Sequence, residues 1–203
     1  MRTLLQSAPA NADEPVVQAL VHFLLEKINE LSELIDFTER LADTLRSSPL
    51  AFVLCHGDMH GWNLLIDNDD RLFIVDWDTL ILAPKERDLM FIGGGHGDSG
   101  YRAEEEEMLF YRGYGKTLVN HDALAYYRFA RALEDIVLFA EQILSTDNDD
   151  NAEDRQQALH YLQSNFLPES TIAQAYRALY DSSRLGPSDD SMQSGKAKQR
   201  WST

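Results

Sequence analysis

The stretch HGDMHGWN, residues 56–63, carries the strongest signal in this 203-residue sequence. The apolar run 50–55 leads into it, and the apolar run 72–75 leads into a second acidic stretch, Asp76-Trp77-Asp78. The apolar runs 63–66 and 72–75 lie on either side of the polar turn 67–70. Short apolar runs that flank such a turn predict a small β-hairpin. The sequence therefore concentrates polar side chains between short strands.

These polar residues match the needs of phosphoryl transfer. One carboxylate must orient or deprotonate the acceptor hydroxyl, and oxygen ligands must hold Mg²⁺ on the phosphates. Asp58 can serve as that carboxylate, and Asn63 with Asp76 can bind the metal. An Asp, an Asn five positions later, and an Asp at the end of the next strand follow the order of a kinase catalytic loop and its metal-binding aspartate.

The rest of the chain shows mostly helical periodicity. We expect one globular unit over residues 1–181, followed by a disordered polar tail over 182–203. The first predicted helix covers 15–46, with room for one break and with Asp13 as its cap. Five later helices are expected, with an acidic break at 147–154; they cover 85–92, 103–114, 123–144, 158–166 and 170–180.

Composition narrows the set of partners. The formal net charge of -16 repels polyanions and argues against nucleic acid, whereas a cationic small molecule would be attracted. The single cysteine, Cys55, lies in an apolar run and excludes an internal disulfide, which fits a reducing compartment. No stretch approaches the roughly 20 apolar residues that span a bilayer. The sequence predicts a cytoplasmic protein without membrane partners.

Four segments resemble the aminoglycoside phosphotransferase family, most nearly its spectinomycin-type members, which phosphorylate a 9-hydroxyl. They are FVLCHGDMHGWNLLI (52–66), LFIVDWDTLILAPKERDLMFIGGG (72–95), FYRGYG (110–115) and AYYRFARALEDI (125–136). The resemblance implies ATP and Mg²⁺ as cofactors. It also implies an α+β, predominantly helical fold, namely a protein-kinase-like C-terminal lobe with a small β-hairpin region that carries the catalytic loop.

The same resemblance assigns roles to individual residues. Asp58 corresponds to the catalytic base, Asn63 and Asp76 to magnesium ligands, and His56 and Asp88 to residues that brace the catalytic loop. Four acidic residues are candidates to bind the ammonium groups of an acceptor: Asp78, Glu86, Glu134 and Asp135. Glu86 is equally suited to an ion-pair cluster with Lys85 and Arg87, and Glu134 to a pair with Arg131.

The sequence also departs from the family. Complete members carry a strand-rich nucleotide lobe before the catalytic loop, whereas the residues before His56 are predicted to be helical and Lys27 falls on a helix. We therefore expect the nucleotide lobe to be absent from this chain, as in a fragment, a truncated product or half of a split protein. We then also expect the chain either to associate with itself or to pair with a separate N-terminal lobe. Phe129 and Ala130 replace expected polar residues, which leaves the acceptor open.

Two other functions stay open at this point. The chain can be a catalytically silent remnant or binding module of the same family. It can also be a metal-dependent hydrolase, with His56, Asp58 and His60 on zinc. Residues 95–100 match the pattern G-x-G-x-x-G, but they follow the catalytic loop, the reverse of the kinase order, and are predicted to be a connection between helices.

Overall fold

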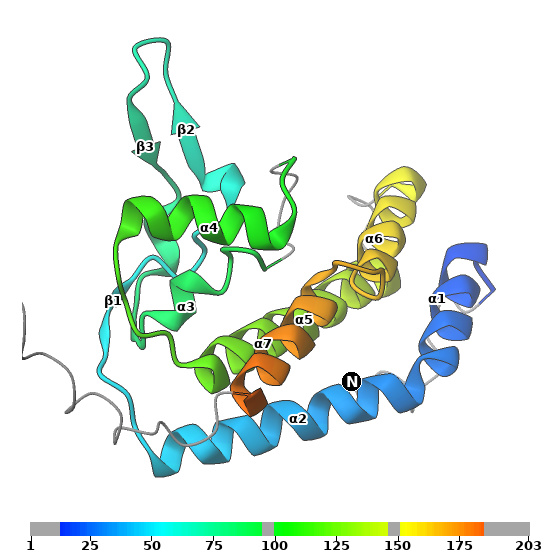
Figure 1. Cartoon of the computed structure of the whole chain (residues 1–203). Helices are drawn as coiled ribbons and strands as arrows, with labels where there is room; N and C mark the ends of the chain where they lie inside the picture. Colours follow the sequence, from blue (N-terminus) through cyan, green and yellow to red (C-terminus); the bar gives the residue numbers. More distant parts are fainter. Residues whose placement is uncertain (1–12, 95–99, 146–150, 185–203) are drawn as a thin grey trace, which may run out of the picture.

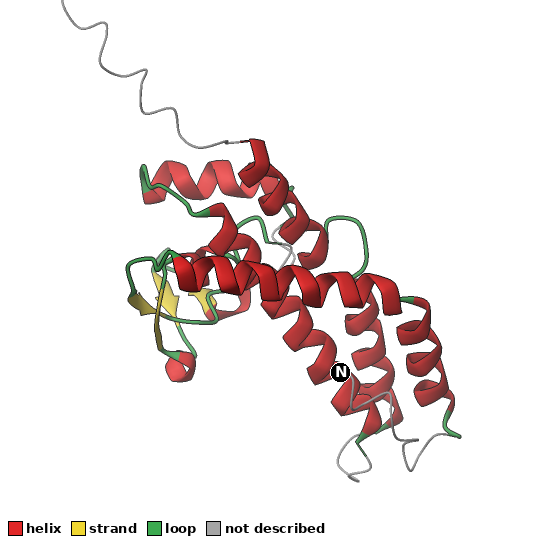
Figure 2. Ribbon diagram, turned by 90° about the horizontal axis from the view of Figure 1, so that it is seen from below, coloured by secondary structure: helices red, strands yellow, loops and turns green. Residues whose placement is uncertain are grey.

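The computed structural model describes residues 13–94, 100–145 and 151–184, and it confirms a predominantly helical α+β fold (Figure 1). Helix α5 (His121–Leu144) lies at its centre and packs against α2 (Ile28–Ser47), α6 (Ala152–Ser164) and α7 (Thr171–Arg184). Figure 2 shows the strands gathered at one end of this helical body. The remaining helices are α1 (Pro15–Glu26), α3 (Glu86–Leu89) and α4 (Ala103–Tyr114).

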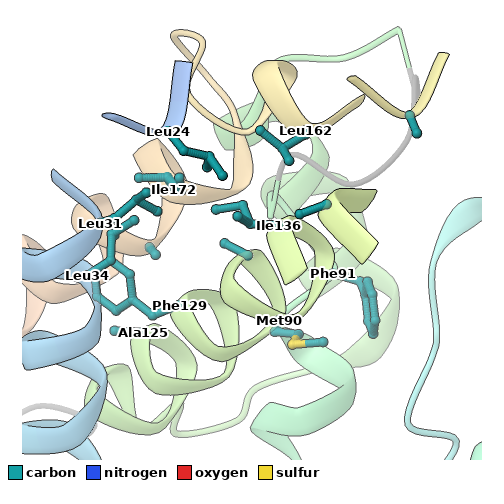
Figure 3. Close-up of a cluster of buried hydrophobic side chains, with 14 of the residues drawn as sticks. Leu24, Leu31, Leu34, Met90, Phe91, Ala125, Phe129, Ile136, Leu162 and Ile172 are labelled. Atoms are coloured by element: carbon teal, nitrogen blue, oxygen red, sulfur yellow. The ribbon is translucent and has the colours of Figure 1, made fainter. Parts of the chain in front are cut away.

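The core forms where the apolar faces of α2 and α5 meet. Leu31 and Leu34 on α2 face Phe129 on α5, and all three side chains are fully buried (Figure 3). The Phe129 ring stacks on Phe37 and meets Tyr176 of α7 edge-on. Phe129, which departs from the expected polar residue, therefore belongs to the core that joins α2, α5 and α7.

The predicted N-terminal helix forms with one break. Lys27 has φ -91° and ψ 6° and separates α1 from α2. The prediction of Asp13 as the cap is wrong, because Glu14 occupies the N-cap position and no side chain caps the helix. The Glu14 carboxylate instead pairs with Arg155 of α6, so tertiary contact replaces local capping.

The strands form two small antiparallel pairs. Strand β2 (Leu64–Ile66) pairs with β3 (Leu72–Ile74), which confirms the predicted hairpin around residues 67–70. Strand β1 (Val53–Cys55) pairs with β4 (Ile81–Ala83), which sequence periodicity did not reveal. The β1–β4 pair brings the start of the loop over residues 56–63 next to the segment that enters α3.

Two predicted boundaries change in the C-terminal part. The sequence predicts an acidic break at 147–154, but α6 begins at Ala152 because the Asn151 side chain accepts hydrogen bonds from the amides of Glu153 and Asp154. Helix α7 continues to Arg184, into the stretch predicted as a polar tail, and residues 185–203 lie outside the described residues. None of the described helices is long and apolar enough to cross a membrane.

Candidate active site

The loop between β1 and β2, which carries the predicted catalytic residues, is anchored at its start by Asp88 on α3. One carboxylate oxygen accepts the amide of His56 and the other accepts the amide of Gly57, both at 2.8 Å. Two hydrogen bonds to an ionised carboxylate are among the stronger contacts available to a backbone. The structure thus places His56 and Asp88, the two predicted bracing residues, together at the start of the loop that carries Asp58.

The imidazole of His56 joins the loop to the strand that leads to Asp76. It is buried, its Nε2 donates to the carbonyl of Val75 at 2.9 Å, and its Nδ1 accepts the amide of Asp58 at 3.3 Å. Both ring nitrogens are therefore occupied by the backbone, and neither has a lone pair for zinc. Across the described residues, no group of three or more His, Cys, Asp or Glu side chains is arranged to hold a metal ion. His56 is therefore not available as a zinc ligand, which argues against a zinc-dependent hydrolase.

Gly57 gives the loop its sharp turn. Its φ is 87°, and a Cβ at this position would lie 2.4 Å from the carbonyl oxygen of Thr79. Thr79 in turn donates its hydroxyl to the carbonyl of His56 at 2.8 Å. Only glycine combines this conformation with this close approach.

We expect Gly57→Ala to destabilise the chain by about 1–3 kcal/mol, because the new methyl must displace either the loop or the backbone at Thr79. Thermal unfolding measures the effect. Gly61→Ala is the matched control, since Gly61 lies in the same loop, has no positive φ, and a methyl group there would meet no described atom within 4 Å. Equal unfolding temperatures for the two variants would contradict this account of Gly57.

Asp58 and Asn63 meet at the other end of the loop. The buried Asn63 amide donates to the carbonyl of Asp58 at 2.8 Å and lies 3.4 Å from its carboxylate. The short helical turn η1 (Gly61–Asn63) ends there, and the Val75 amide donates to the Asn63 carbonyl at 3.0 Å. The predicted base and one predicted magnesium ligand are thus held side by side.

The acidic pair Asp76 and Asp78 follows β3. The Asp76 side chain is exposed, and its backbone adopts the left-handed conformation, with φ 63°. Its pKa is raised by a hydrogen bond with Asp78, then by the charge of Asp78 and, more weakly, of Asp58, whereas the pKa of Asp78 is lowered by the same hydrogen bond. Carboxylates this close compete for a proton, and a divalent cation relieves that repulsion. The pair is chemically suited to magnesium.

The other predicted substrate residues separate into two groups. Glu134 and Asp135 line a surface pocket of about 570 Å³ together with Arg131 and Glu141. Burial raises the pKa of Asp135, and the nearby Arg131 opposes that shift. Glu86 does not join them, because its buried carboxylate contacts the Lys85 ammonium at 2.6 Å and accepts the Asn120 amide at 2.9 Å, at the start of α5.

Residues 6–127 match the phosphotransferase enzyme family. The chain belongs to this family. The expected resemblance to aminoglycoside phosphotransferases is confirmed by two crystal structures of spectinomycin phosphotransferase APH(9)-Ia. The structure in complex with ADP and spectinomycin has 33% identity and a TM-score of 0.75, over 88% of this chain and 55% of that chain. The AMP-bound complex has 34% identity and a TM-score of 0.70, over 82% of this chain and 50% of that chain.

This phosphotransferase family member spans about half the length of those two enzymes. No curated protein sequence gives a significant match. The similarity in fold is therefore established for the part of the relatives that this chain covers, and the family match includes the loop between β1 and β2.

Sequence reasoning assigned Arg131 only as a possible partner of Glu134. In the structure its guanidinium contacts Asp58 and Asp135 instead. The two residues lie four positions apart on a helix, and this spacing was the only sequence signal for the contact between Arg131 and Asp135.

Trp77 packs against His56 with ring centroids 4.8 Å apart, and the Trp62 side chain is 77% exposed.

Proposed function

We propose that this chain carries the catalytic loop of an ATP-dependent phosphotransferase that acts on a hydroxyl of an aminocyclitol or a related small cationic molecule. The observation that supports this most is the joint placement of Asp58 and Asn63 in a loop tied to Asp88. His56 links the same loop to the strand that ends just before Asp76. The residues expected to carry out and support catalysis thus lie on connected segments of one loop region.

In this proposal Asp58 orients the acceptor hydroxyl and accepts its proton. Asn63 and Asp76 hold Mg²⁺, with Asp78 next to Asp76 as a further carboxylate. A Mg²⁺ held by these residues would supply positive charge to offset the negative charge of the transferred phosphoryl group. Asp88 and His56 act by keeping the loop in place, and Glu86 fixes α3 to the start of α5.

The acceptor is proposed from charge and from the relative. APH(9)-Ia was crystallised with ADP and spectinomycin. Glu134 and Asp135 line a pocket beside the Arg131 that contacts Asp58, which is a suitable location for an ammonium group. The net charge of -16 would draw such a cation toward the protein. The buried free thiol of Cys55 is compatible with the proposed cytoplasmic location.

A phosphotransfer assay tests the proposal. The chain is incubated with labelled ATP, Mg²⁺ and a panel of aminocyclitols, with and without a separately supplied strand-rich nucleotide lobe such as that expected for complete family members. We expect labelled product with at least one acceptor when both parts are present. Absence of transfer under every condition would reject the enzymatic function.

We expect Asp76→Ala to weaken nucleotide binding more in the presence of Mg²⁺ than in its absence, because the substitution removes a metal ligand and leaves direct contacts to the nucleotide. Calorimetry with ATP, with Mg²⁺ or with a chelator, measures the difference. Asp69→Ala is the matched control, since this carboxylate is exposed in the turn between β2 and β3. Equal weakening in both conditions would make Asp76 a structural residue.

A binding module without catalysis is the second candidate, and the apolar surface of the two strand pairs favours it. Leu54 and Leu82 lie opposite each other on β1 and β4 and are 66% and 65% exposed, and Ile66 on β2 is 71% exposed. Exposed apolar side chains that are neighbours, as Leu54 and Leu82 are, are typical of a surface that a partner covers. Sedimentation combined with ATP calorimetry separates the candidates: self-association without ATP binding supports the module.

A further inference from the structure

Arg131 connects the predicted catalytic carboxylate to the acidic pocket on α5. Its Nη1 donates to Asp58 Oδ1 at 2.9 Å, and its Nε lies 2.9 Å from Asp135 Oδ1. The Nε contact is too poorly aligned for a hydrogen bond, so it acts through charge. A single guanidinium thus lies between two carboxylates that are far apart in sequence.

The position of Arg131 is supported by the ring of Phe91. The guanidinium carbon lies 5.9 Å from the centre of the Phe91 ring, and this phenylalanine is only 3% exposed. His60 packs against the same ring, with centroids 5.9 Å apart, and its Nε2 lies 3.2 Å from Asp58 Oδ2. One buried ring therefore supports two groups that contact opposite oxygens of Asp58.

The two contacts on Asp58 differ in strength. Arg131 approaches Oδ1 with a permanently charged, planar donor, whereas the His60 contact on Oδ2 is longer and shares that oxygen with Asn63 at 3.4 Å. An incoming hydroxyl can replace the weaker contact more easily. It would then meet Asp58 on the side where Asn63 lies.

We propose that Arg131 is a positioning residue that holds Oδ1 of Asp58, so that Oδ2 receives the acceptor hydroxyl, and that Asp135 holds Arg131 in place. This inference rests on the proposed function of Asp58. Asp135 suits its task because its carboxylate is mostly buried and needs a counter-charge. Its role is therefore to anchor Arg131, and the exposed Glu134 remains available to a cationic acceptor.

Kinetics distinguish positioning from general support of the fold. Arg131→Met keeps much of the length of the side chain and removes its charge, and we expect kcat to fall about 10²-fold with KM for the acceptor unchanged within about twofold. Arg131→Lys keeps the charge but offers no planar fork, so we expect it to recover part of the loss. Arg40→Met is the matched control, because Arg40 also stacks on a phenylalanine, Phe37, but lies exposed on α2.

A second measurement does not depend on turnover. The unfolding temperatures of Asp58→Ala, Arg131→Met and the double variant form a cycle, because alanine removes the oxygen that Arg131 contacts. A second cycle uses Asp135→Ala. We expect each double variant to lose less than the sum of its single variants. Additive losses in the Asp58 cycle, or full kcat in Arg131→Met, would overturn the proposal. If neither the chain alone nor the chain with a supplied nucleotide lobe transfers a phosphoryl group to any acceptor, the proposed function fails, and the cycle still decides whether Arg131 holds Asp58.

Discussion

Asp58→Asn is expected to lower the rate of phosphotransfer by about 10² to 10⁴ while the chain stays folded. Asparagine keeps the size of the side chain but cannot accept a proton from the acceptor hydroxyl. It still offers an oxygen to Arg131 and leaves the backbone carbonyl of residue 58 available to Asn63. The loss should therefore appear in the rate of the chemical step and not in nucleotide affinity.

Single-turnover measurements with labelled ATP test this expectation, and thermal unfolding shows whether the fold survives. Asp43→Asn is the control, because Asp43 also pairs with an arginine, Arg46, but both side chains are exposed on α2. It should leave the rate unchanged. An Asp58→Asn chain with full turnover would remove Asp58 from the mechanism.

Helical periodicity predicted most of the fold. Helix α4 was predicted at 103–114 and lies there, because an acidic first turn and regular apolar spacing agree. The strand Ile81–Ala83 was missed because it is three residues long and its pairing with β1 depends on a contact distant in sequence. The start of α6 was also missed, since the acidic residues that suggested a break are favourable in the first turn of a helix.

The candidate site was predicted to the extent that its residues are close in sequence. Asp58 and Asn63 lie in one loop, and the family resemblance supplied Asp88 and His56. Long-range contacts were beyond the reach of spacing alone: Arg131 meets Asp58 only because α5 packs beside the catalytic loop. Glu86 was a predicted candidate to bind the acceptor because of its position in the sequence. The fold instead buries its carboxylate, which accepts a hydrogen bond at the start of α5.

Arg128 on α5 offers the largest expected effect on stability. Its side chain is 1% exposed and donates to three backbone carbonyls, those of Met90 and Ile92 after α3 and that of Gln174 in α7. Burial lowers its pKa to about 10, so it remains charged at neutral pH. Glu107 of α4 lies 3.7 Å away as its counter-charge.

We expect Arg128→Met to destabilise the chain by about 3–5 kcal/mol, because methionine fills much of the volume but leaves three backbone carbonyls without this donor and Glu107 with one arginine fewer. Denaturant unfolding measures the change. Arg112→Met on the exposed face of α4 is the control and should stay within about 0.5 kcal/mol. Arg128→Lys should fall between the two, since one ammonium cannot reach all three carbonyls.

Arg128→Met also tests whether the stability of α5 affects the loop that starts at His56. Arg128 holds the backbone immediately after α3, the helix whose Asp88 accepts the amides of His56 and Gly57. About one turn further along α5, Arg131 reaches Asp58 from the same helix. Hydrogen exchange should therefore show faster exchange of the His56 and Gly57 amides in Arg128→Met, beyond the change in global stability. If those amides exchange only through global unfolding, as in the unmodified chain, then α5 stabilises the fold without controlling the catalytic loop.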